Sequence, residues 1–335
     1  SSNDYLGLAK VSFDFTDLDS GSTGSRLITG NSLEFEDLEK EIAAWKKTEA
    51  ALFFGSGYLA NLGAISAMAG PRDVIFSDEL NHSCILDGIR LSGAKKFFYK
   101  NLDAKHLQEL LEKHRAGYDK AFVITDTVFS MQGTCADLKS IIDLKQDYDF
   151  TLYLDEAHAT GTLGQTGAGL YASLVEKGDL EANQVEIQMG TFSKACGVEG
   201  AYVAGSKLLI DYLINFARTF IYSTAPSPYV VAMVQQNLKR LINAKDKRQA
   251  LEKNIQYFRS KLDEIKISYT NDQSPIFAIN LSTNEEALVL SEKFLAEKIL
   301  LKAIRPPTVT QPCLRICLHS SHSIDDLDKV LKLLA

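Results

Sequence analysis

The sequence predicts an α/β protein with a mostly parallel sheet flanked by helices, followed by a smaller C-terminal α/β domain. Short apolar segments alternate with longer helical patterns through the first two thirds of the 335 residues. The pattern breaks at TAPSPYV, which contains Pro226 and Pro228 and leads into a long charged stretch. Apolar residues make up 45% and charged residues 24%, a balance typical of a globular protein with a sizeable core.

The larger sheet is predicted from seven short apolar runs that have the length and composition of strands. They are Ala50–Phe54, Asp73–Ser77, Lys95–Tyr99, Ala121–Thr125, Thr151–Leu154, Val185–Met189 and Ala201–Ala204. Helical patterns lie between several of them, at Ser32–Lys47, Tyr58–Ala69, Leu102–His114 and Ala136–Gln146. Since this alternation is typical of βα units, we expect one sheet over about residues 30–225, with helices on both faces.

The rest of the chain predicts one long helix and then a β-α-β-β-α pattern. The helix is expected from Tyr229 to Ile265, and the later elements at Ile276–Leu281, Glu285–Lys298, near Ala303, in CLRICL and at Ile324–Leu334. We therefore expect a large domain over residues 29–238 and a small one over residues 239–335. Residues 1–28 are too few for a domain and are expected to dock onto one of the two. The abrupt start at SSNDYLGL leads us to expect that upstream residues are missing.

The charge balance and the cysteines argue against several classes of function. The net charge is −7, whereas nucleic-acid and anionic-membrane surfaces favour basic patches. No apolar run in the sequence is long enough to cross a bilayer. The five cysteines are irregularly spaced, so we expect reduced thiols in a cytoplasmic protein. We expect no metal site, and no nucleic acid or membrane as a partner.

The stretch FFGSGYLAN leads from an apolar strand through a glycine-serine turn into a helix that starts near Tyr58. The free N–H groups and the dipole of a helix N-terminus favour an anion such as phosphate. The stretch is neither a dinucleotide-binding fingerprint nor a Walker loop. Taken alone, it is better explained as an ordinary turn.

The stretch TLYLDEAHATGTLG ends an apolar strand in Asp155, with His158 three residues later. Polar groups at the C-terminal end of a parallel strand lie at the usual ligand edge of an α/β sheet. A turn-capping aspartate and a structural histidine explain this stretch equally well. The letters LDEAH also resemble a helicase box, but the sequence has no GK[ST] phosphate loop, which excludes that interpretation.

The stretch GTFSKACG places Lys194 among small residues, just after a predicted strand. A surface lysine is the ordinary explanation, because lysine side chains are mostly exposed. A lysine in a desolvated pocket, however, has a lowered pKa and can form a Schiff base with an aldehyde. Pyridoxal 5'-phosphate needs a phosphate anchor, a carboxylate for its pyridine nitrogen and a lysine for its aldehyde. Together the three stretches therefore predict a site for this cofactor.

The chain also resembles the α-oxoamine synthases, fold-type I pyridoxal-phosphate enzymes that condense an amino acid with an acyl thioester. The resemblance spans nearly the whole chain, in the stretches NDYLGL, GSTGSRLITGN, LEFEDLEKEIAAW, FGSGYLAN, DELNHSCILDGIRLS, TDTVFSMQG, LDEAHATGTLG, TFSKACG and IYSTAPSP. The run AIRPPTV followed by CLRICLHSSH is similar to the branch that makes 8-amino-7-oxononanoate in biotin biosynthesis. The resemblance implies a fold-type I transferase that forms a homodimer with shared active sites.

The resemblance implies a role for each residue around the cofactor ring. Lys194 would hold the cofactor covalently and later move the substrate proton. Asp155 would pair with the pyridine nitrogen, and His158 would bond the ring oxygen. His82 would stack on the ring face, unless it only begins a helix. Ser130 would contact the cofactor, unless it only belongs to a turn.

Further contacts to phosphate and substrate follow from the same resemblance. Phosphate contacts are implied for backbone or hydroxyl groups at Gly57, Tyr58, Thr191 and Ser193. Tyr222 and Thr224 resemble phosphate contacts that a second subunit supplies, so a lone subunit would have an incomplete site. Arg315 would clamp the amino-acid carboxylate with bidentate geometry, or else form a structural salt bridge.

Three more residues are implied near the substrate. Arg305 and Thr308 would face the bound substrate or its acyl chain, with a structural role as the alternative. Asn3 would line the same cleft. Two features depart from the family pattern: Asp126 precedes VFS where relatives often have glutamate and then glycine, and LHSSH replaces a threonine-alanine-alanine-histidine run. We expect neither departure to touch the core of the cofactor site.

The reaction implied by the resemblance is a decarboxylating condensation of L-alanine with a pimeloyl thioester of coenzyme A or acyl carrier protein. The same chemistry on glycine and acetyl-CoA, as in 2-amino-3-ketobutyrate ligase, or on another acyl chain, remains open. A non-catalytic partner subunit would have lost its lysine, whereas Lys194 is present. A plain nucleotide-binding α/β protein would show no visible cofactor absorbance.

Overall fold

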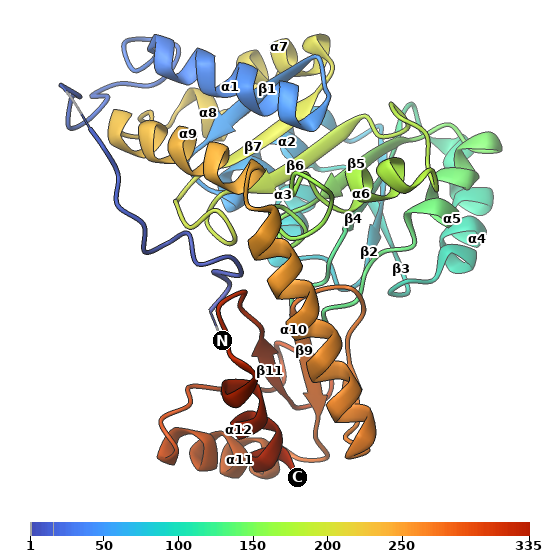
Figure 1. Ribbon diagram of the computed structural model, residues 1–335. Coiled ribbons are helices and arrows are strands. Elements are labelled where there is room, and N and C mark those ends of the chain that lie inside the picture. Colours follow the sequence, from blue (N-terminus) through green and yellow to red (C-terminus); the bar gives the residue numbers. More distant parts are fainter. Residues whose placement is uncertain (1, 16) are drawn as a thin grey trace.

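The computed structural model describes residues 2–15 and 17–335 and contains two β-sheets. A seven-stranded sheet lies in the larger part of the molecule, and a four-stranded sheet lies below it in Figure 1. Helix α10 (Lys245–Glu264) runs from the larger part to the smaller one (Figure 1). The predicted combination of a large α/β body with a smaller C-terminal one is confirmed.

The larger sheet has the strand order β1-β7-β6-β5-β4-β2-β3. Its strands are β1 (Ala50–Phe54), β2 (Val74–Asp78), β3 (Lys95–Tyr99), β4 (Ala121–Asp126), β5 (Thr151–Asp155), β6 (Ile187–Thr191) and β7 (Ala201–Gly205). Among these seven, β7 alone is antiparallel to its neighbours, so the sheet is mostly parallel. Two of the predicted strands have the expected bounds, and the other five differ from them by one or two residues.

Helices cover both faces of this sheet. They are α1 (Leu33–Lys46), α2 (Gly57–Met68), α3 (Ser83–Ser92), α4 (Ala104–His114), α5 (Leu138–Asp143), α6 (Leu170–Lys177), α7 (Lys207–Phe216) and α8 (Arg218–Ile221), with 3-10 turns at Arg115–Gly117 and Leu144–Gln146. Successive strand residues face opposite sides. Phe53 therefore belongs to the same apolar cluster as residues of α1, α4 and α5, whereas Leu52 and Phe54 belong to the cluster formed with α2, α3, α7 and α8. Two apolar layers result, one on each face.

The parallel strands bring several polar residues to one edge of the sheet. Asp126 ends β4 and Asp155 ends β5, and the two are direct partners in the strand register. Thr191 ends β6, and the loop after it contains Lys194. β1 runs in the same direction as β6, so its end leads into the start of α2 at the same edge. The ligand edge predicted from the sequence is therefore assembled from four strands.

The smaller part consists of an antiparallel sheet of order β10-β11-β9-β8 and its helices. Its elements are β8 (Tyr269–Thr270), β9 (Ile276–Asn280), α11 (Asn284–Ala296), β10 (Lys302–Ile304), β11 (Cys313–Cys317) and α12 (Ile324–Leu334). The two-residue strand β8 was not predicted, because a strand that short has no periodicity to detect. Within the described residues, no helix has both the length and the apolar character needed to span a membrane.

The prediction of one helix from Tyr229 to Ile265 is wrong, because two helices occupy this stretch. Helix α9 (Pro228–Ile242) ends before Asn243, and α10 begins at Lys245. The Arg248 guanidinium of α10 donates hydrogen bonds to the carbonyl oxygens of Leu241 and Ile242 at 2.6 and 3.0 Å. These carbonyls lie in the last turn of α9, where that of Leu241 also accepts a backbone N–H, from Ala244 at 3.1 Å, so the buried arginine stabilises the break. The predicted domain boundary at residues 238/239 falls inside α9 and stays a prediction.

The N-terminal segment contacts both parts of the molecule, whereas docking onto one of them was expected. The Asn237 amide of α9 donates to the Leu8 carbonyl, and the Lys247 ammonium of α10 donates to the Leu6 carbonyl. The Ser320 N–H, just beyond β11, donates to the carbonyl of Tyr5, which is fully buried. In Figure 1 this segment runs down the side of the molecule from α1 to β11. It therefore ties the small sheet to the large one.

Replacement of Arg248 by alanine should destabilise the protein, because three carbonyl oxygens lose their donor. The third is that of Gln165, at 2.6 Å from the guanidinium. We expect a loss of about 2–4 kcal/mol in the free energy of unfolding, measured by urea denaturation. Gln249→Ala, at an exposed neighbouring position, is the matched control and should change stability by less than about 0.5 kcal/mol. Equal effects of the two variants would contradict the assignment.

Candidate active site

A cavity of about 220 Å³ lies at the ligand edge of the larger sheet. It is lined by Ser56, Gly57, Tyr58, Asn61, His82, Cys84, Asp126, Ser130, Asp155, Ala157, His158, Met189, Thr191, Ser193 and Lys194. Nine of these positions were predicted from the sequence as cofactor contacts. The chain therefore brings together in one cavity residues that lie more than a hundred positions apart.

One end of the cavity is formed by the start of α2. Ser56 caps the helix by accepting a hydrogen bond from the Leu59 N–H at 3.3 Å. The N–H groups of Gly57 and Tyr58 belong to the first turn and have no intrahelical carbonyl to bond. A Cβ at position 57 would lie 3.1 Å from the Met189 methyl, so glycine leaves room beside Thr191. The Thr191 and Ser193 hydroxyls are 2.8 Å apart, and together with these N–H groups they form an anion-binding cradle.

Asp155 is held rigidly at the middle of the cavity. Its carboxylate accepts a hydrogen bond from the Asn61 amide at 2.7 Å and from the Ala157 N–H at 2.9 Å. The Tyr153 hydroxyl donates to the Asn61 amide oxygen at 2.7 Å, which orients that amide. The side chain of Asp155 is 3% exposed. The free lone pairs of its carboxylate are thus available to a positively charged N–H group in the cavity.

Lys194 extends from the loop after β6 into the same cavity. Within the described residues, no hydrogen bond or ion pair holds its ammonium group. Burial lowers the pKa of Lys194, and the nearby carboxylates of Asp155 and Asp126 oppose this shift. A lysine of this kind has a larger neutral fraction than a surface lysine, and the neutral amine is the nucleophilic and basic form.

Asp126 lines the cavity, which corrects the expectation that it lies outside the cofactor site. Its carboxyl accepts a hydrogen bond from the His82 N–H at 2.9 Å. Burial and the adjacent Asp155 raise the pKa of Asp126 well above its usual range. Two carboxyl groups at neighbouring strand ends disfavour a second negative charge. Through its bond to the His82 N–H, Asp126 anchors the start of α3.

His82 begins α3 and also lies at the exposed mouth of the cavity. Its Nδ1 atom is 3.2 Å from the Cys84 backbone nitrogen, which donates to it, and 2.9 Å from the Cys84 sulfur. Partial burial lowers the pKa of His82. His82 therefore caps α3 and also lines the cavity, and its stacking on the cofactor ring stays a prediction.

A hydrogen-bonded chain joins His158 to the small sheet. The Tyr5 hydroxyl is 2.8 Å from His158 Nδ1 and 3.2 Å from the Asn3 amide oxygen. The Arg315 guanidinium donates to Asn3 Oδ1 at 3.0 Å and, through Nε, to the Ser130 carbonyl at 2.6 Å. Burial lowers the pKa of His158 well below its usual range, and the positive charges of Lys194 and Arg315 add to this effect. His158 is thus kept neutral in the folded protein.

Six predicted site residues do not line this cavity. Asn3 and Arg315 belong to the hydrogen-bonded chain beside it, and the other four lie elsewhere in the single chain. Arg305 and Thr308 are exposed in the segment between β10 and β11 and do not line the cavity. Thr224 lines a separate pocket of about 170 Å³, and Tyr222 is 71% exposed. Their expected roles at the substrate and in a partner's site stay predictions.

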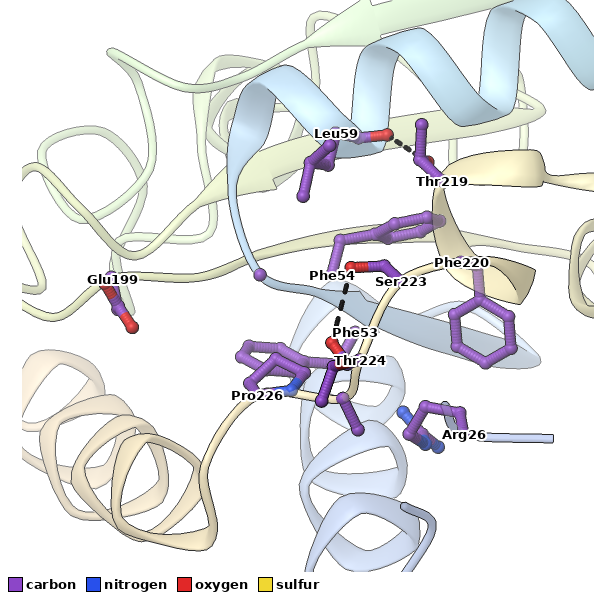
Figure 2. A pocket seen from close by; sticks show the side chains of 12 residues that line it. Arg26, Phe53, Phe54, Leu59, Glu199, Thr219, Phe220, Ser223, Thr224 and Pro226 are labelled. Carbon is purple, nitrogen blue, oxygen red and sulfur yellow. Dashed lines mark hydrogen bonds between the residues drawn. The ribbon is translucent and has the colours of Figure 1, made fainter. Parts of the chain in front are cut away.

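Figure 2 shows this second pocket, with Thr224 between Phe220 and Pro226 on the loop that follows α8. Arg26 lies beside it and pairs with both Glu39 carboxylate oxygens at 2.9 and 3.0 Å. The Arg26 guanidinium also lies 5.3 Å from the centre of the Phe220 ring. This ion pair fixes the N-terminal wall of the pocket.

Sequence reasoning missed several residues that hold the site together. Asn61 lies four positions after Gly57, so both face the cavity from α2, and helical spacing could have identified it. Cys84 lies two residues after His82 and was classed only as a reduced thiol. Tyr5 is 153 positions from its partner His158, and no local pattern reveals that contact.

Comparisons with known proteins agree with this geometry. A family model described as aminotransferase class I and II matches residues 1–334. The 8-amino-7-oxononanoate synthase of Lysinibacillus sphaericus is 41% identical over 342 residues, covering 99% of this chain and 86% of that protein.

Solved structures show the same architecture. The 8-amino-7-oxononanoate synthase of Francisella tularensis superposes with a TM-score of 0.85 at 32% identity, covering 100% of this chain and 95% of that one. The serine palmitoyltransferase of Sphingomonas wittichii superposes with a TM-score of 0.91 at 27% identity, covering 99% and 85%. The predicted fold class is therefore confirmed.

The neutral, buried state of His158 should make stability fall as the pH decreases below about 6.5, the ordinary pKa of histidine. In this range the unfolded chain takes up a proton that the folded protein does not bind, so proton uptake favours unfolding. In the His158→Gln variant, the unfolded chain has no imidazole at position 158 and so cannot take up this proton. Its free energy of unfolding should therefore depend less steeply on pH, by up to about 1.4 kcal/mol per pH unit. Urea denaturation between pH 6.5 and 5 tests this expectation, and parallel pH profiles would refute it.

Proposed function

Because the chain belongs to the aminotransferase class I and II family, we propose that it is a pyridoxal-phosphate enzyme that makes 8-amino-7-oxononanoate in biotin biosynthesis. The reaction joins the α-carbon of L-alanine to the acyl carbon of a pimeloyl thioester. It releases the thiol of the carrier, coenzyme A or acyl carrier protein, together with carbon dioxide. The observation that carries this proposal is the joint placement of Lys194, Asp155 and the cradle at Gly57 in one cavity.

The donor set of the cavity fits pyridoxal phosphate. The cradle of α2 N–H groups with the Thr191 and Ser193 hydroxyls suits a phosphate dianion, and Tyr58 and Gly57 contribute its backbone donors. When bound, this cofactor supplies an aldehyde carbon for amines and a protonated ring that absorbs the electrons of a carbanion. The glycine at position 57 leaves the space that a phosphate needs close to the backbone.

Lys194 provides the amine and the base. Its lowered pKa increases the neutral fraction, so that its Nζ can hold the cofactor and then remove the proton from the α-carbon of alanine. The same Nζ returns a proton after carbon dioxide has left. Asp155 and Asp126 oppose the lowering of the pKa, which keeps the amine basic enough to accept that proton.

The acid and the two histidines orient the ring. Asp155 would accept the N–H of the pyridine nitrogen, and its fixed carboxylate would keep that nitrogen protonated. His158, whose Nδ1 is bonded to the Tyr5 hydroxyl, would direct its Nε2 to the ring oxygen, with Ser130 nearby. His82 would stack on the ring face and exclude water from it.

The substrate groups are assigned to residues beside the cavity. Arg315 donates hydrogen bonds to Ser130, Cys317 and Asn3. Its two remaining N–H groups can donate to the alanine carboxylate. Arg305 and Thr308, on the exposed segment between β10 and β11, are assigned to the acyl chain. Asn3 lines the cleft beside Arg315.

The proposed enzyme acts in the cytoplasm as a homodimer in which Tyr222 and Thr224 reach the partner's phosphate cradle. Exposed apolar side chains support a second copy as the partner. They include Ile28 at 80%, Leu33 at 72%, Leu208 at 81% and Phe216 at 56% exposure. Large apolar side chains with this degree of exposure are typical of subunit contacts. The domain division at residues 28/29 and 238/239 belongs to the same proposal.

The function is tested by supplying purified protein and pyridoxal phosphate with L-alanine or glycine, each with pimeloyl-CoA or acetyl-CoA. Mass spectrometry should find 8-amino-7-oxononanoate from alanine and pimeloyl-CoA. In Lys194→Ala, product formation should fall by at least about a thousandfold, because both the amine and the base are lost. Product from glycine and acetyl-CoA instead would overturn the substrate assignment, and full activity of Lys194→Ala would overturn the mechanism.

The shared site predicts complementation between two inactive variants. Thr224→Arg should block the partner's phosphate cradle, and Lys194→Ala inactivates its own site. A mixed dimer then has one site with both defects and one site with neither. Co-refolded variants should recover about a quarter of the wild-type activity if subunits pair at random. No recovery, with mixed dimers present by mass, would show that Thr224 acts within its own chain.

A further inference from the structure

A polar relay connects Asp155 to His82 through two side chains that sequence reasoning did not assign. We propose that Asn61 and Cys84 are positioning residues that hold His82 with Nδ1 as a hydrogen-bond acceptor and its proton on Nε2. The geometry of the relay stands without any assumption about the reaction. Its significance for turnover, through His82 beside the cofactor ring, rests on the proposed function.

The relay begins at Asn61, whose side chain is completely buried. Both N–H bonds of its amide are used, one to Asp155 Oδ2 at 2.7 Å and the other to the Cys84 sulfur at 3.1 Å. Its oxygen accepts the Tyr153 hydroxyl proton at 2.7 Å. A carboxylate can only accept at neutral pH, so the nitrogen of the amide must face Asp155. The orientation of Asn61 is therefore determined by its partners.

Close packing of α2 against α3 brings Cys84 to this amide. The two helices lie side by side, and Gly88 of α3 faces the backbone of Asn61. A Cβ at position 88 would lie 3.0 Å from the Asn61 carbonyl oxygen. The absence of a side chain at Gly88 thus permits the helix approach that places the thiol between an amide and an imidazole.

The Cys84 sulfur links Asn61 to His82 by hydrogen bonds on both sides. Burial, reinforced by the charge of Asp155, raises the pKa of the Cys84 thiol to about 12, so the sulfur carries its proton at neutral pH. The sulfur accepts from Asn61, and its S–H can then donate to His82 Nδ1, 2.9 Å away. The Cys84 backbone N–H donates to the same nitrogen at 3.2 Å. With two donors directed at it, Nδ1 is the unprotonated nitrogen.

The consequence is that neutral His82 offers an N–H only at Nε2, the nitrogen that α3 does not engage. The charged groups that act on this imidazole are Asp155, which favours protonation, and Lys194, which opposes it. Asp126 accepts the His82 backbone N–H and so fixes the residue from the other side. A second proton on Nδ1 would have to displace both Cys84 donors. The relay therefore keeps His82 neutral as well as oriented.

The test uses nitrogen-15 NMR of the full chain, with and without pyridoxal phosphate, to assign the tautomer and titrate His82. The His82→Gln variant identifies its signals among the six histidines. The wild type should show Nδ1 as the unprotonated nitrogen. Cys84→Ala should raise the pKa of His82 by about half a unit to one unit and mix the tautomers. Cys84→Ser retains a donor at the same position and should restore the wild-type tautomer.

Each outcome decides the inference independently of the reaction. A proton on Nδ1 in the wild type would overturn it, as would an unchanged titration and tautomer in Cys84→Ala. Restoration by serine would exclude a loss of packing as the cause, because serine replaces the donor but not the volume of the sulfur. If no 8-amino-7-oxononanoate is formed while the NMR result is as expected, the proposed reaction is wrong and the inference about the relay is retained.

Discussion

The site depends on one electrostatic constraint, the placement of two carboxyl groups at the adjacent ends of β4 and β5. Because Asp126 and Asp155 are register partners, only one of them can readily carry a charge in this buried setting. The donors around Asp155, from Asn61 and Ala157, fix the orientation of its carboxylate. Burial outweighs the opposing effect of Asp155 and Asp126 on Lys194 and lowers the pKa of its amine. The acid and the base of the pocket are thus set by the sheet register.

A second constraint is that the pocket belongs to no single part of the chain. Ser130 and His158 come from the large sheet, Arg315 from the small one, and Asn3 and Tyr5 from the N-terminal segment. Because hydrogen bonds join these residues, the geometry of the site depends on where the small sheet lies. A change in that position would alter the Arg315 donors and the environment of His158 together, since one chain of bonds joins them.

The strands could be predicted because each is a short apolar run bounded by polar residues, and the site residues because they follow those strands. Lys194, Asp155 and Gly57 were found by this logic. The break between α9 and α10 was not, since the arginine that stabilises it lies six positions beyond the carbonyl of Ile242 and looks like any helix-surface charge. Tyr5 was missed for another reason, because its partner His158 is 153 positions away and no local pattern encodes that contact. Helical spacing from Gly57 could have placed Asn61 at the cavity, but not its bond to Asp155, 94 positions away.

The N-terminal segment also has a consequence for how the molecule is made. A chain synthesised from its N-terminus presents Asn3 and Tyr5 long before Arg315, which lies 312 positions beyond Asn3. Contacts that close so long a loop form late in folding. The large sheet can therefore assemble before Arg315 bonds to Asn3 and Ser130 beside the pocket. A chain that stops before Arg315 carries the lysine and the acid but lacks the guanidinium that holds these two neighbours in place.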